Sequence, residues 1–149
     1  MNENEVGTQI VDAAVRLHKK LGSGLMENVY EVILSKLLAE KGLHVQRQVS
    51  IPIELEGEYF DKGFRADLFV EGKVIVELKS VDKITDAHKK QLLTYLKLTN
   101  IKLGYILNFG AVLMKDGIVR IINGVIPNHG VHGEDQRSQR AFPATLQPP

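Results

Sequence analysis

The sequence predicts one mixed α/β domain, in which helices flank a mixed β-sheet. Apolar residues recur at three- and four-residue steps in the first part of the chain, which is typical of amphipathic helices. The segment Phe64–Lys79 instead alternates with a period of two, which indicates a pair of strands. A third helical pattern lies between this pair and an apolar run, and it predicts a right-handed crossover between parallel strands.

The composition is that of a globular domain. The chain has 149 residues, of which 44% are hydrophobic and 25% charged, as in ordinary soluble domains. It contains no cysteine, which excludes disulfides and thiolate zinc sites. The net charge of +1 neither supports nor excludes a nucleic-acid partner. Because no signal peptide or membrane-spanning apolar run is visible, we expect no membrane association and a cytoplasmic location.

Two helices are predicted at the start of the chain. The first covers residues 4–20, and Gly22 begins a break after it. Its apolar face comprises Val6, Ile10, Ala13 or Ala14, Leu17 and Leu21. The second runs from about residue 25 to residue 41, with Gly42 as its C-terminal stop. Glu27 falls in its first turn, where a carboxylate is favourable to the helix dipole whatever its function.

The next segment predicts two strands. Residues 43–53 alternate apolar and polar positions, and Pro52 favours an edge position or an interruption of this strand. Residues 56–58 predict a turn, after which the second strand begins at Tyr59. Gly63 indicates a bulge or a bend in that second strand.

The alternation within Phe64–Lys79 predicts how its two strands pair. A single apolar face forms only in the register that also places Asp67 opposite Glu77, with Lys79 next along the same face. A two-residue connection would shift the pairing by one residue and separate the two carboxylates. We therefore expect a three-residue connection, or a bulge, around Gly72.

The polar face of this hairpin carries the candidate chemistry. Opposed side chains lie about 5 Å apart at Cβ, and two carboxylates about 4 Å apart repel by about 4 kcal/mol at an effective dielectric of about 20. A divalent cation between Asp67 and Glu77 would remove this repulsion, because Mg²⁺ and Mn²⁺ prefer oxygen ligands. Lys79 could then orient a water nucleophile or stabilise developing charge on a phosphate. The alternative is a solvent-facing hairpin in which the lysine pairs with the carboxylates.

A third helix is predicted over residues 85–98. Thr85 or Asp82 would cap it. Gln91 and Tyr95 are four residues apart and therefore share one face of this helix.

The C-terminal part predicts further strands and then a tail. The apolar run 101–109 indicates a buried strand, and a hairpin is expected between residues 112–114 and 118–122. The edge of this hairpin could pair with another copy, so we expect a possible homodimer. Because four of the five prolines come late in the chain, residues 1–124 form the predicted domain and 125–149 a flexible tail.

Three separated patterns together resemble one known family. They are GLMENVY at residues 24–30, Asp67 with Glu77-Leu78-Lys79, and Gln91 with Tyr95. In this order, and in a strand–turn–strand–helix context, they resemble the GxxExxY proteins of the PD-(D/E)XK nuclease superfamily. The resemblance covers roughly residues 5–124. Ala66 stands where the superfamily name has a proline.

The resemblance implies a restriction-endonuclease-like core and a nuclease that depends on Mg²⁺ or Mn²⁺. The implied metal ligands are Asp67, Glu77, the backbone carbonyl of Leu78 and Glu27. Lys79 would position or deprotonate the attacking water, and Gln91 and Tyr95 would support the site and contact the phosphate.

Two functions follow from these patterns. The first is hydrolysis of phosphodiester bonds in DNA or RNA, which the two opposed carboxylates favour. The second is a non-catalytic module on the same fold that binds nucleic acid or protein and associates with itself, which the low net charge favours. Metal binding discriminates between them. No aromatic residue is marked by the sequence as an exposed platform for stacking bases.

Overall fold

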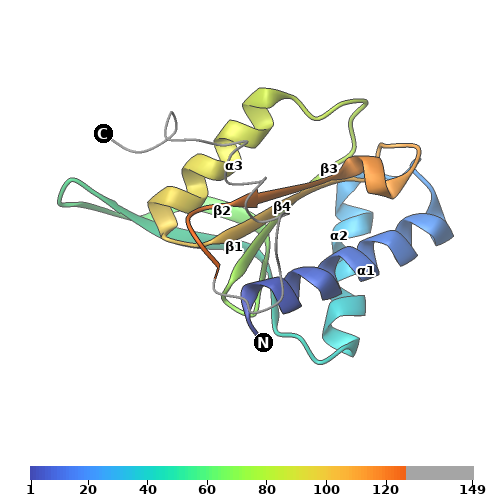
Figure 1. Ribbon diagram of the computed structural model, residues 1–149, viewed down its shortest axis with the longest axis horizontal. Helices are drawn as coiled ribbons and strands as arrows, with labels where there is room; N and C mark the ends of the chain where they lie inside the picture. Colours follow the sequence, from blue (N-terminus) through green and yellow to red (C-terminus); the bar gives the residue numbers. More distant parts are fainter. Residues whose placement is uncertain (127–149) are drawn as a thin grey trace.

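The computed structural model describes residues 1–126 and shows three layers (Figure 1). A five-stranded sheet with the order β1-β2-β3-β4-β5 forms the middle layer. Helices α1 (Glu3–Leu21) and α2 (Glu27–Glu40) cover one face, and α3 (Asp86–Thr99) covers the other. The predicted α/β class, a sheet flanked by helices in a restriction-endonuclease-like arrangement, is confirmed.

The sheet is mixed. Its strands are β1 (Val45–Leu55), β2 (Glu58–Val70), β3 (Val74–Lys79), β4 (Leu103–Asn108) and β5 (Ile118–Ile122). Strands β3 and β4 run parallel, while each of the other neighbouring pairs is antiparallel. Helix α3 connects the two parallel strands, as the sequence predicted, because parallel neighbours need a crossover connection.

Two hydrophobic clusters fill the spaces on the two sides of the sheet. One lies between the sheet and helices α1 and α2, and the other lies under α3. The predicted apolar face of α1 is buried with one exception. Leu21 is 39% exposed, since the helix ends there and the chain turns away at Gly22, which has a φ of 72°.

The β2–β3 hairpin has the predicted register. Leu68 lies opposite Val76 and Val70 opposite Val74, so one face of the hairpin is apolar. The connection has three residues, and Glu71 and Gly72 within it have positive φ values of 55° and 62°. The predicted three-residue connection is therefore confirmed.

The β1–β2 hairpin is long and its tip extends beyond the rest of the sheet (Figure 1). Strand β1 is an edge strand, and the register shifts where Pro52 lies, opposite the segment that contains Gly63. Both features were predicted. The sequence marked no aromatic residue as exposed. In the structure, however, Tyr59 and Phe60 near the tip are 62% and 52% exposed.

The C-terminal hairpin uses a different partner from the predicted one. Residues 112–114 form no strand, and Met114–Gly117 is a short 3-10 helix, η1. Strand β5 pairs instead with β4, from Leu103↔Ile122 to Leu107↔Ile118. The physical reason is that β4 is buried along its whole length, and its backbone groups need a partner on both sides. Residues 112–114 are too short to provide one, and Met114 packs into the core.

The core extends slightly past the predicted domain boundary. Ile126 is only 5% exposed and belongs to the cluster under α1 and α2. The remainder of the predicted tail, residues 127–149, lies outside the described residues. Within residues 1–126, no helix has the length and apolar character needed to cross a membrane.

Candidate active site

Strands β2 and β3 bring Asp67 and Glu77 to the same face of the sheet. The backbone pairing of the two strands ends at Leu68↔Val76. One residue further on, Asp67 Oδ2 accepts a hydrogen bond from the backbone N–H of Leu78 at 2.9 Å. The side chain of Asp67 therefore provides the bond to β3 where the backbone hydrogen bonds between the two strands stop. This bond anchors Asp67 beside Glu77.

Glu77 has an unusual electrostatic environment. Burial is the main cause that raises its pKa from 4.5 to about 9, and the neighbouring Asp67 carboxylate raises it further as a like charge and as a hydrogen-bond partner. The ammonium of Lys79 acts in the opposite direction. Glu77 Oε1 is buried, and no group within residues 1–126 forms a hydrogen bond with it. A buried acceptor without a donor is rare, and a bound cation or a water molecule would satisfy it.

A cleft of about 360 Å³ opens between β2, β3 and α3. It is lined by Lys62, Gly63, Phe64, Arg65, Glu77, Lys79, His88, Gln91, Leu92, Tyr95 and Ile106. Four of the side chains predicted from the sequence therefore meet in one cavity: Glu77 and Lys79 from β3, and Gln91 and Tyr95 from α3. Asp67 and Leu78 adjoin this cavity through Glu77 without lining it.

The end of β3 that carries Lys79 is held by the neighbouring strand. The backbone carbonyl of Lys79 accepts a hydrogen bond from the N–H of Phe109 at 2.9 Å. The side chain of Asn108, which is 2% exposed, bonds to both the N–H and the carbonyl of Val81 at 3.0 and 2.9 Å. These contacts fix the backbone on both sides of Ser80, so that the lysine projects from a rigid base.

Helix α3 supplies the opposite wall of the cleft. Thr85 caps the helix as predicted and forms a capping box with His88, whose Nδ1 accepts the N–H of Thr85 at 3.1 Å. Gln91 Nε2 donates to the hydroxyl of Tyr95 at 3.2 Å. The ring of Tyr95 stacks on Phe64 of β2 with centroids 3.9 Å apart. The predicted Gln–Tyr pair is therefore present on the cleft side of α3, and its role stays a prediction.

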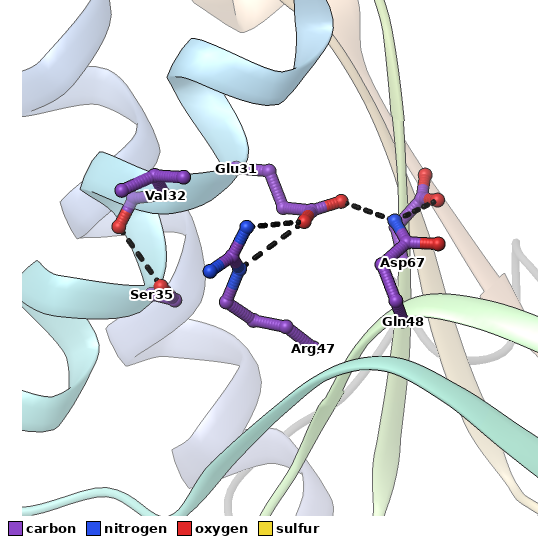
Figure 2. A network of polar contacts seen from close by, with 6 residues as sticks. All are labelled: Glu31, Val32, Ser35, Arg47, Gln48 and Asp67. Carbon is purple, nitrogen blue, oxygen red and sulfur yellow. Dashed lines mark hydrogen bonds and ion pairs between the residues drawn. The ribbon is translucent and has the colours of Figure 1, made fainter.

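Glu27 does not join the other predicted ligands. It is exposed at the first residue of α2, and residues 1–126 contain no group of three or more His, Cys, Asp or Glu side chains placed to hold a metal ion. The acidic residue of α2 that approaches the site is Glu31, one turn further along. It is buried, and it connects to Asp67 through the amide of Gln48 (Figure 2).

The Gly-x-x-Glu-x-x-Tyr spacing that ends at Tyr30 has a structural explanation in this chain. The hydroxyl of Tyr30 donates to the carbonyl of Gly22 at 2.6 Å and accepts the N–H of Leu25 at 3.1 Å. Ser80 Oγ donates to the carbonyl of Leu25 at 3.2 Å. The tyrosine thus shapes the loop before α2, and the serine ties that loop to the residue that follows Lys79.

Sequence reasoning missed four polar residues around the site: Lys62, Arg65, Glu31 and Gln48. Arg65 could have been predicted from the sequence, because it precedes Asp67 by two residues in the same strand and therefore shares its face. Lys62 could not have been predicted in this way. It precedes the register shift near Gly63, and across such a shift the alternation of residues no longer indicates which face of the sheet a side chain lies on.

Comparison with known proteins agrees with this arrangement. The family model described as PD-(D/E)XK nuclease superfamily matches residues 4–121, which include every predicted site residue. A search of the curated proteins found no match. The family match covers more than half of the chain, and Asp67 with Glu77-Leu78-Lys79 fits the D…(D/E)XK part of the superfamily name. The chain belongs to the PD-(D/E)XK nuclease superfamily.

Proposed function

We propose that this protein is a divalent-metal-dependent phosphodiesterase that cleaves DNA or RNA. The observation that carries the proposal is Glu77 Oε1, a buried acceptor without a donor within residues 1–126, beside a second carboxylate. It lies at a cleft whose other charged lining groups include Lys62, Arg65 and Lys79. A cleft of this charge suits a phosphodiester, whose phosphate is an anion.

The donor atoms of the site fit a hard cation such as Mg²⁺ or Mn²⁺. Asp67, Glu77 and the backbone carbonyl of Leu78 would hold it, as oxygen ligands do for these ions. Bound there, the cation would supply positive charge that neutralises the carboxylates and polarises the scissile phosphate. Glu77 must release its proton to become a ligand. Glu27 would become a further ligand only if its exposed side chain approached this group, so its role stays a prediction.

The side chains of the cleft then have distinct tasks. Lys79 lies beside Glu77 on the same strand, where its ammonium can orient the attacking water or stabilise the charge that develops on the phosphate. Arg65 presents a planar group that can bind two phosphate oxygens at once. Gln91 and Tyr95 offer an amide and a hydroxyl to the substrate from the side of α3.

A non-catalytic module on the same fold is the second candidate. The observation that favours it is the lack, within residues 1–126, of a group of three acidic or histidine side chains arranged for a metal ion. Such a module would bind nucleic acid or protein through the same cleft. Self-association through the sheet edge at β5 stays a prediction under either function.

Metal binding and cleavage by matched variants test the proposal. We expect wild type to bind Mn²⁺ saturably in calorimetry and to cleave single- or double-stranded DNA or RNA. Asp67→Ala and Glu77→Ala should lose both properties. Lys79→Met should retain Mn²⁺ binding but cleave about 10²- to 10⁴-fold more slowly, the usual contribution of a proton-transfer group.

The controls are exposed residues of the same type outside the cleft. Asp116→Ala and Lys115→Met change side chains on η1 and should leave binding and cleavage unchanged. Wild type that binds no Mn²⁺, even with nucleic acid present, would refute the enzyme and leave the binding module. Wild-type cleavage by Asp67→Ala would likewise contradict the assignment of the ligands.

A further inference from the structure

Gln48 has a backbone conformation that strands rarely contain. It lies in the middle of β1, yet its φ is 49°, in the left-handed region. Residues other than glycine are uncommon there, and asparagine, aspartate and histidine are enriched among those that occur. Such strain persists where the surrounding structure requires it, and it is enriched at functional sites.

The strained residue lies directly across from the candidate metal ligand. Strands β1 and β2 pair at Arg47↔Leu68 and again at Val49↔Ala66. The intervening position, Gln48 opposite Asp67, is not paired through the backbone. The left-handed conformation of Gln48 therefore interrupts the backbone pairing of β1 and β2 at the position where β2 carries the Asp67 carboxylate.

The amide of Gln48 bridges two carboxylates (Figure 2). Its Nε2 donates to Glu31 Oε1 at 2.6 Å and to Asp67 Oδ1 at 3.2 Å. An amide nitrogen has two hydrogens, so both are used. Glu31 is 6% exposed and is itself held by the guanidinium of Arg47 at 3.1 and 3.2 Å. The far end of the bridge is therefore anchored to α2, and the amide cannot rotate without losing both contacts.

Asp67 is consequently held at both of its oxygens. Gln48 donates to Oδ1 from one neighbouring strand, and the N–H of Leu78 donates to Oδ2 from the other. Each carboxylate oxygen has two lone pairs, so one on each oxygen is left for another ligand. Partners of this kind orient metal-binding carboxylates and tune their affinity for the ion.

We infer that Gln48 is a positioning residue that orients Asp67 for metal binding, and that Glu31, anchored by Arg47, orients Gln48. The inference rests on the proposed metal site. Stability alone gives a poor account of the contact with Asp67, because Gln48 is exposed and its bond to Asp67 is exposed to solvent, where a hydrogen bond contributes little net stability. A strained backbone that gains so little in folding is explained by the position it gives to Asp67.

The test compares two glutamine-to-glycine variants of β1. Gln48→Gly removes the amide and accommodates the positive φ without strain. Gln46→Gly removes an amide from an exposed residue that pairs regularly with Phe69 and has no positive φ. Mn²⁺ affinity is measured by calorimetry, and stability by the melting temperature of the metal-free protein.

We expect Gln48→Gly to raise the Kd for Mn²⁺ about 10- to 100-fold, as loss of a partner of a ligand does. The melting temperature should change little, because relief of the positive φ offsets the lost bond to the buried Glu31. Gln46→Gly should lower the melting temperature and leave the Kd unchanged. Gln48→Asn also tolerates the left-handed conformation but is one methylene too short to reach both carboxylates. It should weaken Mn²⁺ binding in the same way, and it replaces the glycine variant if that protein does not fold.

The outcomes separate this inference from the proposed function. Unchanged Mn²⁺ affinity in Gln48→Gly and Gln48→Asn, with normal binding by wild type, would overturn the role of Gln48 alone. A lower melting temperature with unchanged affinity would show that Gln48 is merely structural. Wild type that binds no Mn²⁺ would overturn both the metal site and the role of Gln48.

Discussion

Glu77 is protonated at neutral pH in the folded, metal-free protein, because burial and the Asp67 carboxylate raise its pKa to about 9. In the unfolded chain its pKa returns to about 4.5. Between these two values the folded state binds a proton that the unfolded state does not. The free energy of unfolding therefore falls as the pH rises through this window. Below pH 4.5 Glu77 is protonated in both states, so it no longer changes the free energy of unfolding.

The variant Glu77→Gln tests this linkage. It replaces the neutral acid with a neutral amide, so the metal-free variant should lose less stability than wild type between pH 5 and pH 9. Urea denaturation at several pH values measures the difference. The exposed Glu54→Gln serves as control and should follow the wild-type curve. Parallel pH curves for wild type and Glu77→Gln would show that Glu77 titrates normally.

Some residues of the site could be predicted from the sequence, and others could not. Asp67, Glu77 and Lys79 were predicted together, because a period of two places them on one face once the apolar face is aligned. Gln48 was not predicted, since its position depends on one backbone angle that no side-chain pattern encodes. Glu31 was missed for a similar reason, because contacts between a helix and an edge strand are not visible in local periodicity.

Among the elements, the β1–β2 hairpin shows how turn chemistry limits a strand pair. Leu55 pairs with Glu58, which leaves a two-residue turn of Glu56 and Gly57. Both turn residues have positive φ, at 50° and 80°. This is the pattern of a type I′ turn, for which Asn-Gly is preferred. Glutamate at the first position therefore stores strain at the tip.

Replacement of Glu56 by asparagine should stabilise the protein. Asparagine tolerates the left-handed conformation better than glutamate, and we expect a gain of about 0.5–1 kcal/mol in the free energy of unfolding. Urea denaturation measures the gain. Glu58→Asn is the matched control in the regular strand, where asparagine is disfavoured and no gain is expected. Equal effects of the two substitutions would contradict a role of the turn conformation.

The C-terminal strands show where an element-level prediction failed. Alternation over residues 112–114 indicated a strand, but three residues carry too little pattern to outweigh tertiary structure. Strand β5 pairs with the buried strand β4, and residues 114–117 form a 3-10 helix from which Met114 packs into the core. Strand β5 itself was predicted at the correct residues, and only its partner was wrong.

For the whole molecule, the core of the described residues reaches as far as Ile126, which is 5% exposed. Ile126→Ala should destabilise the protein by about 2 kcal/mol, near the lower end for a buried isoleucine because the site lies at the edge of the core. Thermal or urea denaturation measures the loss. Val125→Ala, at a residue that is 69% exposed, is the matched control and should be nearly neutral. Equal stability of the two variants would show that Ile126 contributes nothing to the core.

The sequence by itself determined the order of the helices and of strands β1 to β4, the register of the β2–β3 hairpin and the three residues Asp67, Glu77 and Lys79. Each of these follows from local periodicity, which a residue carries whatever its distant neighbours are. Only the tertiary structure decided the partner of β5, the basic lining of the cleft and the bridge from Glu31 through Gln48 to Asp67. Those features depend on contacts between segments far apart in the chain, and on a strained backbone angle that those contacts maintain.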